Sequence, residues 1–200
     1  MRRLGIFGGT FSPPHVGHVL AAEAFSDQMR LDILLIVPTR TPPHKTVDGT
    51  VTAEERLEMC KRAFSRIEKA TISDIEIRRG GKSYTYLTLE ELTEDGTELF
   101  FLCGTDMILT LGEWKNPERI FELATVCYVR REDDEALNAE IAEKVAAYER
   151  DYGARIVAIR HTPLELSSTE IRAALAESKD ACGLVDASTL AYIRERGLYR

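Results

Sequence analysis

The chain has 200 residues, of which 44% are hydrophobic, and a formal net charge of −7 at pH 7. This length and apolar content support one well-filled domain and exclude a miniprotein that depends on disulfides or metals. The acidic balance, without a basic stripe, argues against broad binding to nucleic acids or anionic membranes. An anionic ligand must therefore be held by a local cluster of polar groups.

The sequence also indicates the compartment. No apolar run approaches the roughly 18 residues needed to cross a bilayer, and after Met1 the chain reaches glycines and prolines before a signal-peptide core can form. We therefore expect a soluble, cytoplasmic protein. The cysteines are widely spaced without a CxxC pair, which favours buried reduced thiols over a metal site or disulfides. They are Cys60, Cys103, Cys127 and Cys182.

The stretch LGIFGGTFSPPHVGH, residues 4–18, carries the strongest functional signal. A short apolar strand runs into Gly8 and Gly9, passes two prolines and restarts as a helix near His15. Glycines let backbone N–H groups approach an anion, and a helix N-terminus adds its positive dipole end. His15 and His18 are three residues apart, so they share one helical face. These features predict a phosphate site, and more specifically a nucleotide site.

The next elements predict a parallel sheet. A helix over residues 16–29 is followed by a purely apolar strand over residues 33–37. A strand, a helix and a second strand, with both strands apolar throughout, are typical of a parallel sheet covered on both faces and joined by a right-handed crossover. The loop over residues 38–51 has three prolines and no periodicity. Loops of this length in compact domains are more often functional than idle.

A capping box begins the next helix. Thr52 is the expected N-cap and Glu55 reaches back to it, which predicts a helix to about residue 66. The apolar and polar residues alternate over residues 72–77, which predicts a third strand. Residues 78–82 then form a turn.

The middle of the chain continues the alternation of helices and strands. Ser83 could cap a helix over residues 84–92, and a buried strand is expected over residues 99–103. A polar loop with Trp114 and a short proline-initiated helix follow. Residues 125–129 form the next strand.

The C-terminal third begins with a charged, alanine-rich helix over residues 132–152 and the last strand, over residues 156–159. Ser167 and Glu170 form a second capping box, which predicts a helix to about residue 177. A closing helix over residues 187–196 ends at a glycine.

This order predicts an α/β protein with a doubly wound, mostly parallel sheet of about six strands and helices on both faces. We expect a single domain over residues 1–200, in which roughly residues 164–200 form a small helical C-terminal part. In such sheets, ligands bind beyond the carboxyl ends of the strands. The unusual residues of this chain fall at such ends, in residues 8–18, 42–45, 104–106 and 167–172.

The candidates near the N-terminus also have ordinary structural interpretations. His15 and His18 could simply cap or pack. As zinc ligands they would need a third ligand that the sequence does not name, so hydrogen bonding to phosphate fits better. Lys45 could be a solvated loop lysine, but the stiff Pro42-Pro43-His44 segment before it favours a phosphate contact.

The candidates later in the chain also have ordinary structural interpretations. Asp106 could cap the turn that follows it, or its carboxylate could accept two ribose hydroxyls. Trp114 is the only tryptophan and could be core, but its polar loop favours a role in covering a planar ligand. The hydroxyls of residues 167–169 could cap a helix and also bind an anion, with Arg172 one turn inside.

Several motifs together carry a family resemblance. In this order and spacing, GGTFSPPHVGH, PPHK, SYT, GTD, the lone Trp114 and SSTEIR resemble the bacterial nicotinate mononucleotide adenylyltransferases. These enzymes belong to the nucleotidyltransferases with the HxGH signature and a Rossmann-like fold, and the similarity covers nearly the whole chain. HxGH alone is shared with other adenylyl- and cytidylyltransferases, whereas the combination is specific.

The resemblance implies a reaction and its partners. The adenylyl group of ATP would pass to nicotinate mononucleotide, giving nicotinate adenine dinucleotide and pyrophosphate in NAD biosynthesis. Mg²⁺ would arrive on the ATP phosphates rather than in a protein metal site. The partners would be the two substrates, without nucleic acid or membrane, and a homo-oligomer is compatible with this.

The resemblance also implies a role for each matching residue. The ATP site would comprise Gly8, Gly9, Thr10, Phe11, His15, His18, Gly104, Asp106, Ser168, Thr169 and Arg172. The catalytic residues would be His15, His18, Lys45 and Arg172. The mononucleotide would contact Lys45, Tyr84, Thr85 and Trp114, with its carboxylate recognised largely by backbone N–H groups.

One position departs from the family pattern. Ser12 stands where the family usually has an aspartate, so the turn keeps a hydrogen-bonding group but lacks a charge. The basic residue usual after the fifth strand could be Arg130 or Arg131. Two alternatives stay open: an adenylyltransferase for nicotinamide mononucleotide or another phosphate acceptor, and a nucleotide-binding module without catalysis.

Overall fold

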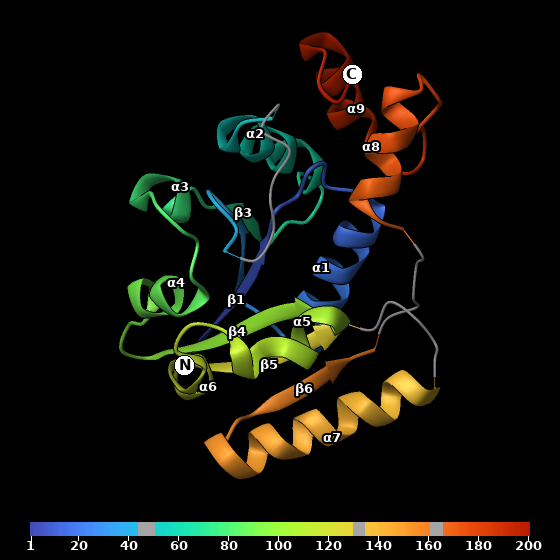
Figure 1. Ribbon diagram of the computed structural model, residues 1–200. Coiled ribbons are helices and arrows are strands. Elements are labelled where there is room, and N and C mark those ends of the chain that lie inside the picture. The colour runs from blue at the N-terminus through green and yellow to red at the C-terminus, as the bar shows by residue number, and fades with distance from the viewer. Residues whose placement is uncertain (44–50, 130–134, 161–165) are drawn as a thin grey trace.

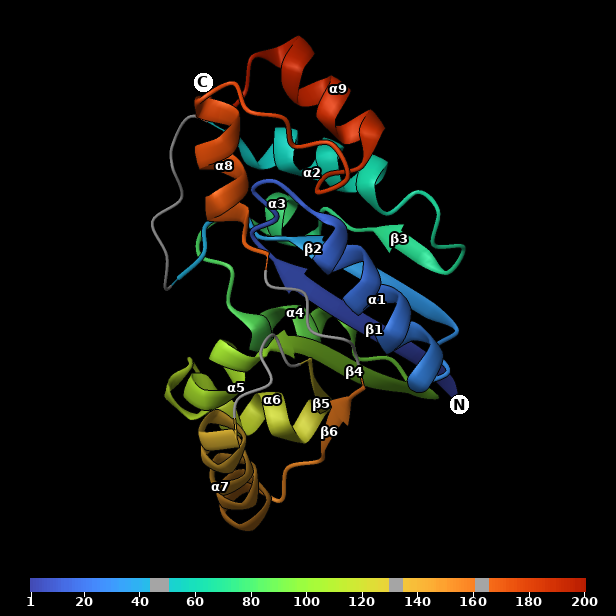
Figure 2. The ribbon, with the colours of Figure 1, turned by 90° about the vertical axis from the view of Figure 1, so that its right-hand side faces the viewer.

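The computed structural model describes residues 1–43, 51–129, 135–160 and 166–200. Within these ranges, six parallel strands form one sheet in the order β3-β2-β1-β4-β5-β6, with helices on both faces (Figures 1 and 2). The predicted doubly wound α/β sheet is confirmed. The strands are β1 (Arg2–Gly9), β2 (Ile33–Pro38), β3 (Ala70–Ile72), β4 (Thr97–Gly104), β5 (Ala124–Val129) and β6 (Ile156–Ile159).

The central strands are apolar throughout because both of their faces are buried. Leu4 and Ile6 of β1 lie in one hydrophobic core with Phe101 of β4. Phe7 lies in the opposite core with Phe100. Successive side chains of a strand point to opposite faces, so a sheet covered on both sides has no polar stripe.

The helices divide between the two faces of the sheet. One core contains buried residues of α1 (Val16–Gln28) and α2 (Ala53–Ala63). The opposite core contains buried residues of four helices: α4 (Thr85–Leu92), α5 (Thr105–Thr110), α6 (Pro117–Leu123) and α7 (Glu135–Tyr152). The strand order reverses between β1 and its neighbours β2 and β4, which is where such sheets bind ligands.

The C-terminal helices form a third apolar cluster on α2. They are α8 (Ser168–Ala176) and α9 (Ala187–Arg196), and Figure 2 shows both beside α2. Met59 of α2, Ile171 and Ile193 meet in this cluster. The division into one domain with a helical C-terminal part stays a prediction.

Both predicted capping boxes are confirmed. The Thr52 hydroxyl accepts a hydrogen bond from the Glu55 backbone at 3.1 Å, and the Glu55 carboxylate accepts one from the Thr52 backbone at 2.9 Å. Ser167 and Glu170 make the same pair of contacts, at 3.2 and 2.9 Å. The sequence specifies these helix starts because all of the groups involved lie within three residues.

The predicted third strand over residues 72–77 is wrong. The strand ends at Ile72, and residues 75–77 instead begin α3 (Ile75–Arg79). Arg78 Nε donates to Asp74 Oδ1 at 2.8 Å, an i,i+4 pair that favours a helical turn over an extended strand. The segment is ambiguous because Ile72 and Ile75 have helical spacing, whereas Ile75 and Ile77 have strand spacing.

The cysteine prediction holds for three of the four residues. Cys60, Cys103 and Cys127 are buried free thiols, whereas Cys182 is exposed. Burial raises the pKa of Cys127 to about 12, which keeps its thiol protonated and unreactive. Among the described helices, none is both long and apolar enough to cross a bilayer.

Candidate active site

The turn between β1 and α1 lies at the carboxyl end of β1. A Cβ atom on Gly9 would lie 2.8 Å from the Phe11 ring, so this close passage requires glycine. Phe11 has φ 49° and is 2% exposed, and its ring packs edge-on against Phe7 and His18. The side chain of Phe11 therefore supports the turn from within the core instead of facing a ligand.

The two histidines lie together at the first turn of α1. The backbone N–H of His15, the N-cap, donates to Nδ1 of His18 at 3.2 Å, and the ring centroids are 3.7 Å apart. Because Nδ1 of His18 accepts this bond, the neutral ring carries its proton on Nε2. The backbone N–H of Val16 donates to the Leu184 carbonyl at 2.9 Å, so this helix N–H group already has a protein partner.

The start of α8 meets this turn, as the motif arrangement predicted. Ser168 Oγ donates to the Pro13 carbonyl at 2.9 Å. Arg172 donates from Nη1 to the Ser12 carbonyl at 2.8 Å and from Nη2 to Thr169 Oγ1 at 3.1 Å. Ser168 therefore contacts the turn directly. The Arg172 guanidinium is oriented by one oxygen of the turn and one oxygen of α8.

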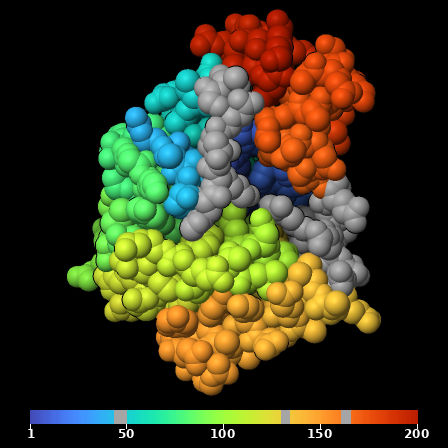
Figure 3. Space-filling view, viewed as in Figure 1, coloured from blue at the N-terminus to red at the C-terminus, as the bar shows by residue number. Residues whose placement is uncertain are grey.

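A cavity of about 350 Å³ lies on the other side of the turn. The indole of Trp114 forms one wall and packs edge-on against Phe101, with the ring centroids 6.3 Å apart. Figure 3 shows the blue N-terminal residues in a recess beside the orange α8. The predicted site residues that line the cavity are Gly8, Gly9, Thr10, Tyr84, Thr85, Asp106 and Trp114.

The structure thus sorts the predicted residues into two adjoining groups. The histidines and the α8 residues lie around the turn. The cavity is lined by Tyr84, Thr85 and Trp114, which are predicted for the mononucleotide, together with Gly8–Thr10 and Asp106, which are predicted for ATP. Gly104 is the N-cap of α5, two residues before Asp106, which lines the cavity. Three predicted basic residues, Lys45, Arg130 and Arg131, lie outside the described residues.

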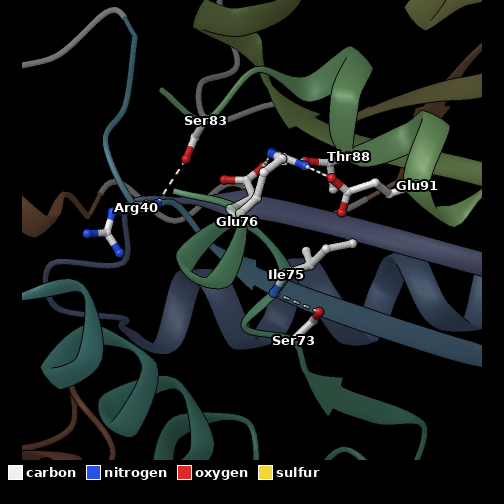
Figure 4. Close-up of polar contacts among 8 residues, drawn as sticks. Arg40, Ser73, Ile75, Glu76, Ser83, Thr88 and Glu91 are labelled. Carbon is white, nitrogen blue, oxygen red and sulfur yellow. Dashed lines mark hydrogen bonds and ion pairs between the residues drawn. The ribbon is translucent and has the colours of Figure 1, made fainter. Parts of the chain in front are cut away.

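Glu76 lines the same cavity, although no sequence motif points to it. The residue is 6% exposed, and its Oε1 accepts a hydrogen bond from Thr88 Oγ1 at 2.7 Å (Figure 4). The Thr88 hydroxyl in turn accepts one from Arg79 Nη2 at 3.0 Å. Burial raises the pKa of Glu76, opposed by the hydroxyls of Thr88 and Ser83 and by the charge of Arg79.

Ser83 connects this network to the end of β2. The predicted helix cap is wrong, because Tyr84 is the N-cap of α4 and the Ser83 hydroxyl accepts a hydrogen bond from the Arg40 backbone at 2.9 Å. The Ser83 N–H donates to the Thr41 carbonyl, also at 2.9 Å. Figure 4 shows Arg40, Ser83 and Glu76 gathered at this junction. The network holds the start of α4, which is one wall of the cavity.

We expect Thr88→Val to destabilise the protein by about 1–3 kcal/mol, although the two side chains have similar volumes. The change removes the donor to the buried Glu76 carboxylate and the acceptor for Arg79. Denaturant unfolding measures the loss, with Thr93→Val as the control because the Thr93 hydroxyl donates to a backbone carbonyl near the surface. Equal effects of the two substitutions would show that the network contributes nothing specific.

Arg56 is a second buried polar residue that no sequence motif indicates. It is 1% exposed, and its guanidinium donates to the carbonyls of Thr10 at 2.7 Å, Thr39 at 2.6 Å and Arg40 at 3.1 Å. Burial lowers the pKa of Arg56. This single side chain thereby ties the loop after β1 to the loop after β2, on which the cavity depends.

Comparisons with known proteins identify relatives of the whole chain. A family model described as cytidylyltransferase-like matches residues 6–174. A relative from Chromobacterium violaceum, named probable nicotinate-nucleotide adenylyltransferase, is 36% identical over 99% of each chain. A relative of the same name from Geotalea daltonii is 37% identical over 98% of each chain.

Solved structures show the same fold. Nicotinic acid mononucleotide adenylyltransferase from Plasmodium falciparum, solved in complex with NaAD, is 18% identical and aligns with a TM-score of 0.76 over 100% of this chain and 98% of its own. The same enzyme in complex with APC aligns with a TM-score of 0.75 over the same shares at 17% identity. With full-length relatives above 30% identity, the chain belongs to the nicotinate-nucleotide adenylyltransferases of the cytidylyltransferase-like family.

Proposed function

We propose that the protein transfers the adenylyl group of ATP to nicotinate mononucleotide, releasing nicotinate adenine dinucleotide and pyrophosphate. The observation that carries the proposal is the junction at Gly8–Thr10. These residues line the cavity and lead directly into the turn that bears His15 and His18. A ligand in the cavity and a nucleotide held by the turn would meet there.

The turn and α8 supply the groups that an ATP triphosphate needs. Arg172 provides a guanidinium whose orientation is set by two hydrogen bonds, and His18 provides a proton on Nε2. Both are donors that suit phosphate oxygens. Asp106, at the first turn of α5, is proposed to accept hydrogen bonds from the adenosine ribose.

The cavity fits the mononucleotide. Its volume of about 350 Å³ is within the range of small-molecule sites. The indole of Trp114 offers a flat apolar wall for a pyridine ring. At the start of α4, the Tyr84 N–H already donates to the Lys82 carbonyl at 3.1 Å, so Thr85 is the residue whose backbone N–H we propose for the ring's carboxylate. Lys45 is proposed to contact the mononucleotide phosphate.

The reaction requires positioning more than acid–base chemistry. The attacking group is a phosphate that is already ionised at neutral pH, so neither a general base nor a covalent intermediate is needed. The protein has to align two anions that repel each other and to stabilise the charge that grows on pyrophosphate. His18 and Arg172 hold donors where that charge develops.

Nucleotidyltransferases use a divalent cation with ATP, and we propose that this protein uses Mg²⁺. Mg²⁺ prefers oxygen ligands, which the triphosphate supplies, and when bound it neutralises part of the phosphate charge. The described part of the chain contains no group of three His, Cys, Asp or Glu side chains suited to a metal ion. Arg172 and the histidines fit the phosphates of a metal–ATP complex.

The acceptor is tested by comparing the acid and amide mononucleotides. We expect kcat/KM for nicotinate mononucleotide to exceed that for nicotinamide mononucleotide by about tenfold or more, since the two ligands differ at one recognised polar group. Pyrophosphate release at several concentrations of each acceptor measures the ratio. Equal values, or a preference for the amide, would assign the protein to the related acceptor instead.

A further inference from the structure

The C-terminal segment reaches the phosphate-binding turn through a contact that the proposed mechanism does not use. The hydroxyls of Ser12 and Tyr199 are 2.9 Å apart in a buried hydrogen bond between residues 187 positions apart. Ser12 is 5% exposed and lies three residues before His15. The hydroxyl of Ser12 in the turn is therefore hydrogen-bonded to Tyr199, at the end of the C-terminal segment.

Tyr199 is held firmly in this place. Its side chain belongs to the cluster formed by α2, α8 and α9, and the residue is 7% exposed. Its φ of 62° is in the left-handed region, which bulky residues rarely adopt unless the surrounding structure imposes it. Burial raises its pKa above the usual range of a phenol, which keeps the hydroxyl protonated and able to donate or accept.

Ser12 connects Tyr199 to Arg172 through two hydrogen bonds. The Ser12 carbonyl accepts the hydrogen bond from Arg172 Nη1, while its hydroxyl meets Tyr199. The Ser12 side chain and its carbonyl belong to one residue, so a shift of the side chain moves the group that orients the guanidinium. The turn is thus held from the C-terminal part by Arg172, Ser168 and Tyr199 together.

We propose that Tyr199 is a positioning residue for ATP: through Ser12, its hydroxyl holds the turn and the Arg172 guanidinium in the arrangement that binds the phosphates. The inference rests on the proposed use of ATP and concerns the nucleotide half of the site alone. The cavity on the other side of the turn does not include Tyr199.

The test measures binding of Mg²⁺–ATP by calorimetry without an acceptor. We expect Tyr199→Phe to weaken this binding about fivefold or more because the turn loses a bond that holds it. Since the ring stays in place, the loss of stability should not exceed that of one buried hydrogen bond. Ser12→Ala removes the other partner of the same hydrogen bond and should weaken ATP binding to a similar extent. The double variant should be no weaker than either single variant, since one interaction is lost only once.

Tyr192→Phe is the matched control. Tyr192 packs against the same cluster, but its ring lies under the Arg62 guanidinium instead of reaching the turn. We expect its ATP affinity to be unchanged. Wild-type affinity in Tyr199→Phe, or additive losses in the double variant, would overturn the inference.

The outcome is separable from the choice of acceptor. If wild-type protein binds ATP but makes no dinucleotide, the proposed function fails while a weakened Tyr199→Phe still supports the positioning role. If turnover occurs and Tyr199→Phe binds ATP normally, only the positioning role fails. A wild-type protein that does not bind ATP would overturn both.

Discussion

His18→Ala is expected to lower kcat by about 10² or more, the loss typical of one preorganised donor to developing negative charge. Because Nδ1 of His18 accepts the backbone N–H of His15, the neutral ring carries its proton on Nε2, the atom proposed to donate to a phosphate. Steady-state rates at saturating substrates measure the effect. The melting temperature should fall only slightly.

Two further substitutions separate the role of Nε2 as a donor from the role of Nδ1, which accepts the His15 backbone N–H. An Asn side chain can place an acceptor near the position of Nδ1, whereas a Gln side chain can place a donor near the position of Nε2. His18→Asn should therefore keep the cap but be as slow as His18→Ala, and His18→Gln should recover part of the rate. Normal turnover in His18→Asn, or a large loss of stability in every variant, would assign His18 a structural role only.

Arg56→Met is expected to lower the free energy of unfolding by about 2–4 kcal/mol, the largest stability loss that we predict. Methionine fills much of the volume but leaves the partly buried carbonyls of Thr10, Thr39 and Arg40 without their donor. The substitution also removes the desolvation penalty of a buried charge, and this limits the expected loss of stability. Urea unfolding measures the difference.

The control for Arg56 lies on the same helix. Arg62 is partly exposed and forms an i,i+4 pair with Glu58 at 3.1 Å. Such pairs contribute less than about 1 kcal/mol, so Arg62→Met should change stability little. If Arg56→Met were as mild as Arg62→Met, the guanidinium would not be what joins the two loops.

The sequence predicts those parts of the site whose groups lie close together along the chain. The His15 and His18 pair and the Ser167 cap each depend on contacts within three residues, and both are found as expected. The apolar strands predict the parallel sheet, and the sheet places their carboxyl ends at one edge. Local patterns therefore locate the turn and the start of α8.

The missed residues depend on contacts between distant segments. An arginine in an amphipathic helix ordinarily points to solvent, and only the fold brings Arg56 beneath two loops. Glu76 was hidden because its five-residue helix resembled a strand. Tyr199 meets Ser12 across almost the entire chain, and no local pattern encodes that contact.

The central claim is that ATP held at the turn reacts with a mononucleotide held in the cavity. Its most direct test mixes the protein with Mg²⁺, ATP and nicotinate mononucleotide and quantifies dinucleotide and pyrophosphate in the same samples. The account predicts that both products form in equal amounts, and that neither forms when the mononucleotide is left out. Binding of ATP without either product would contradict it.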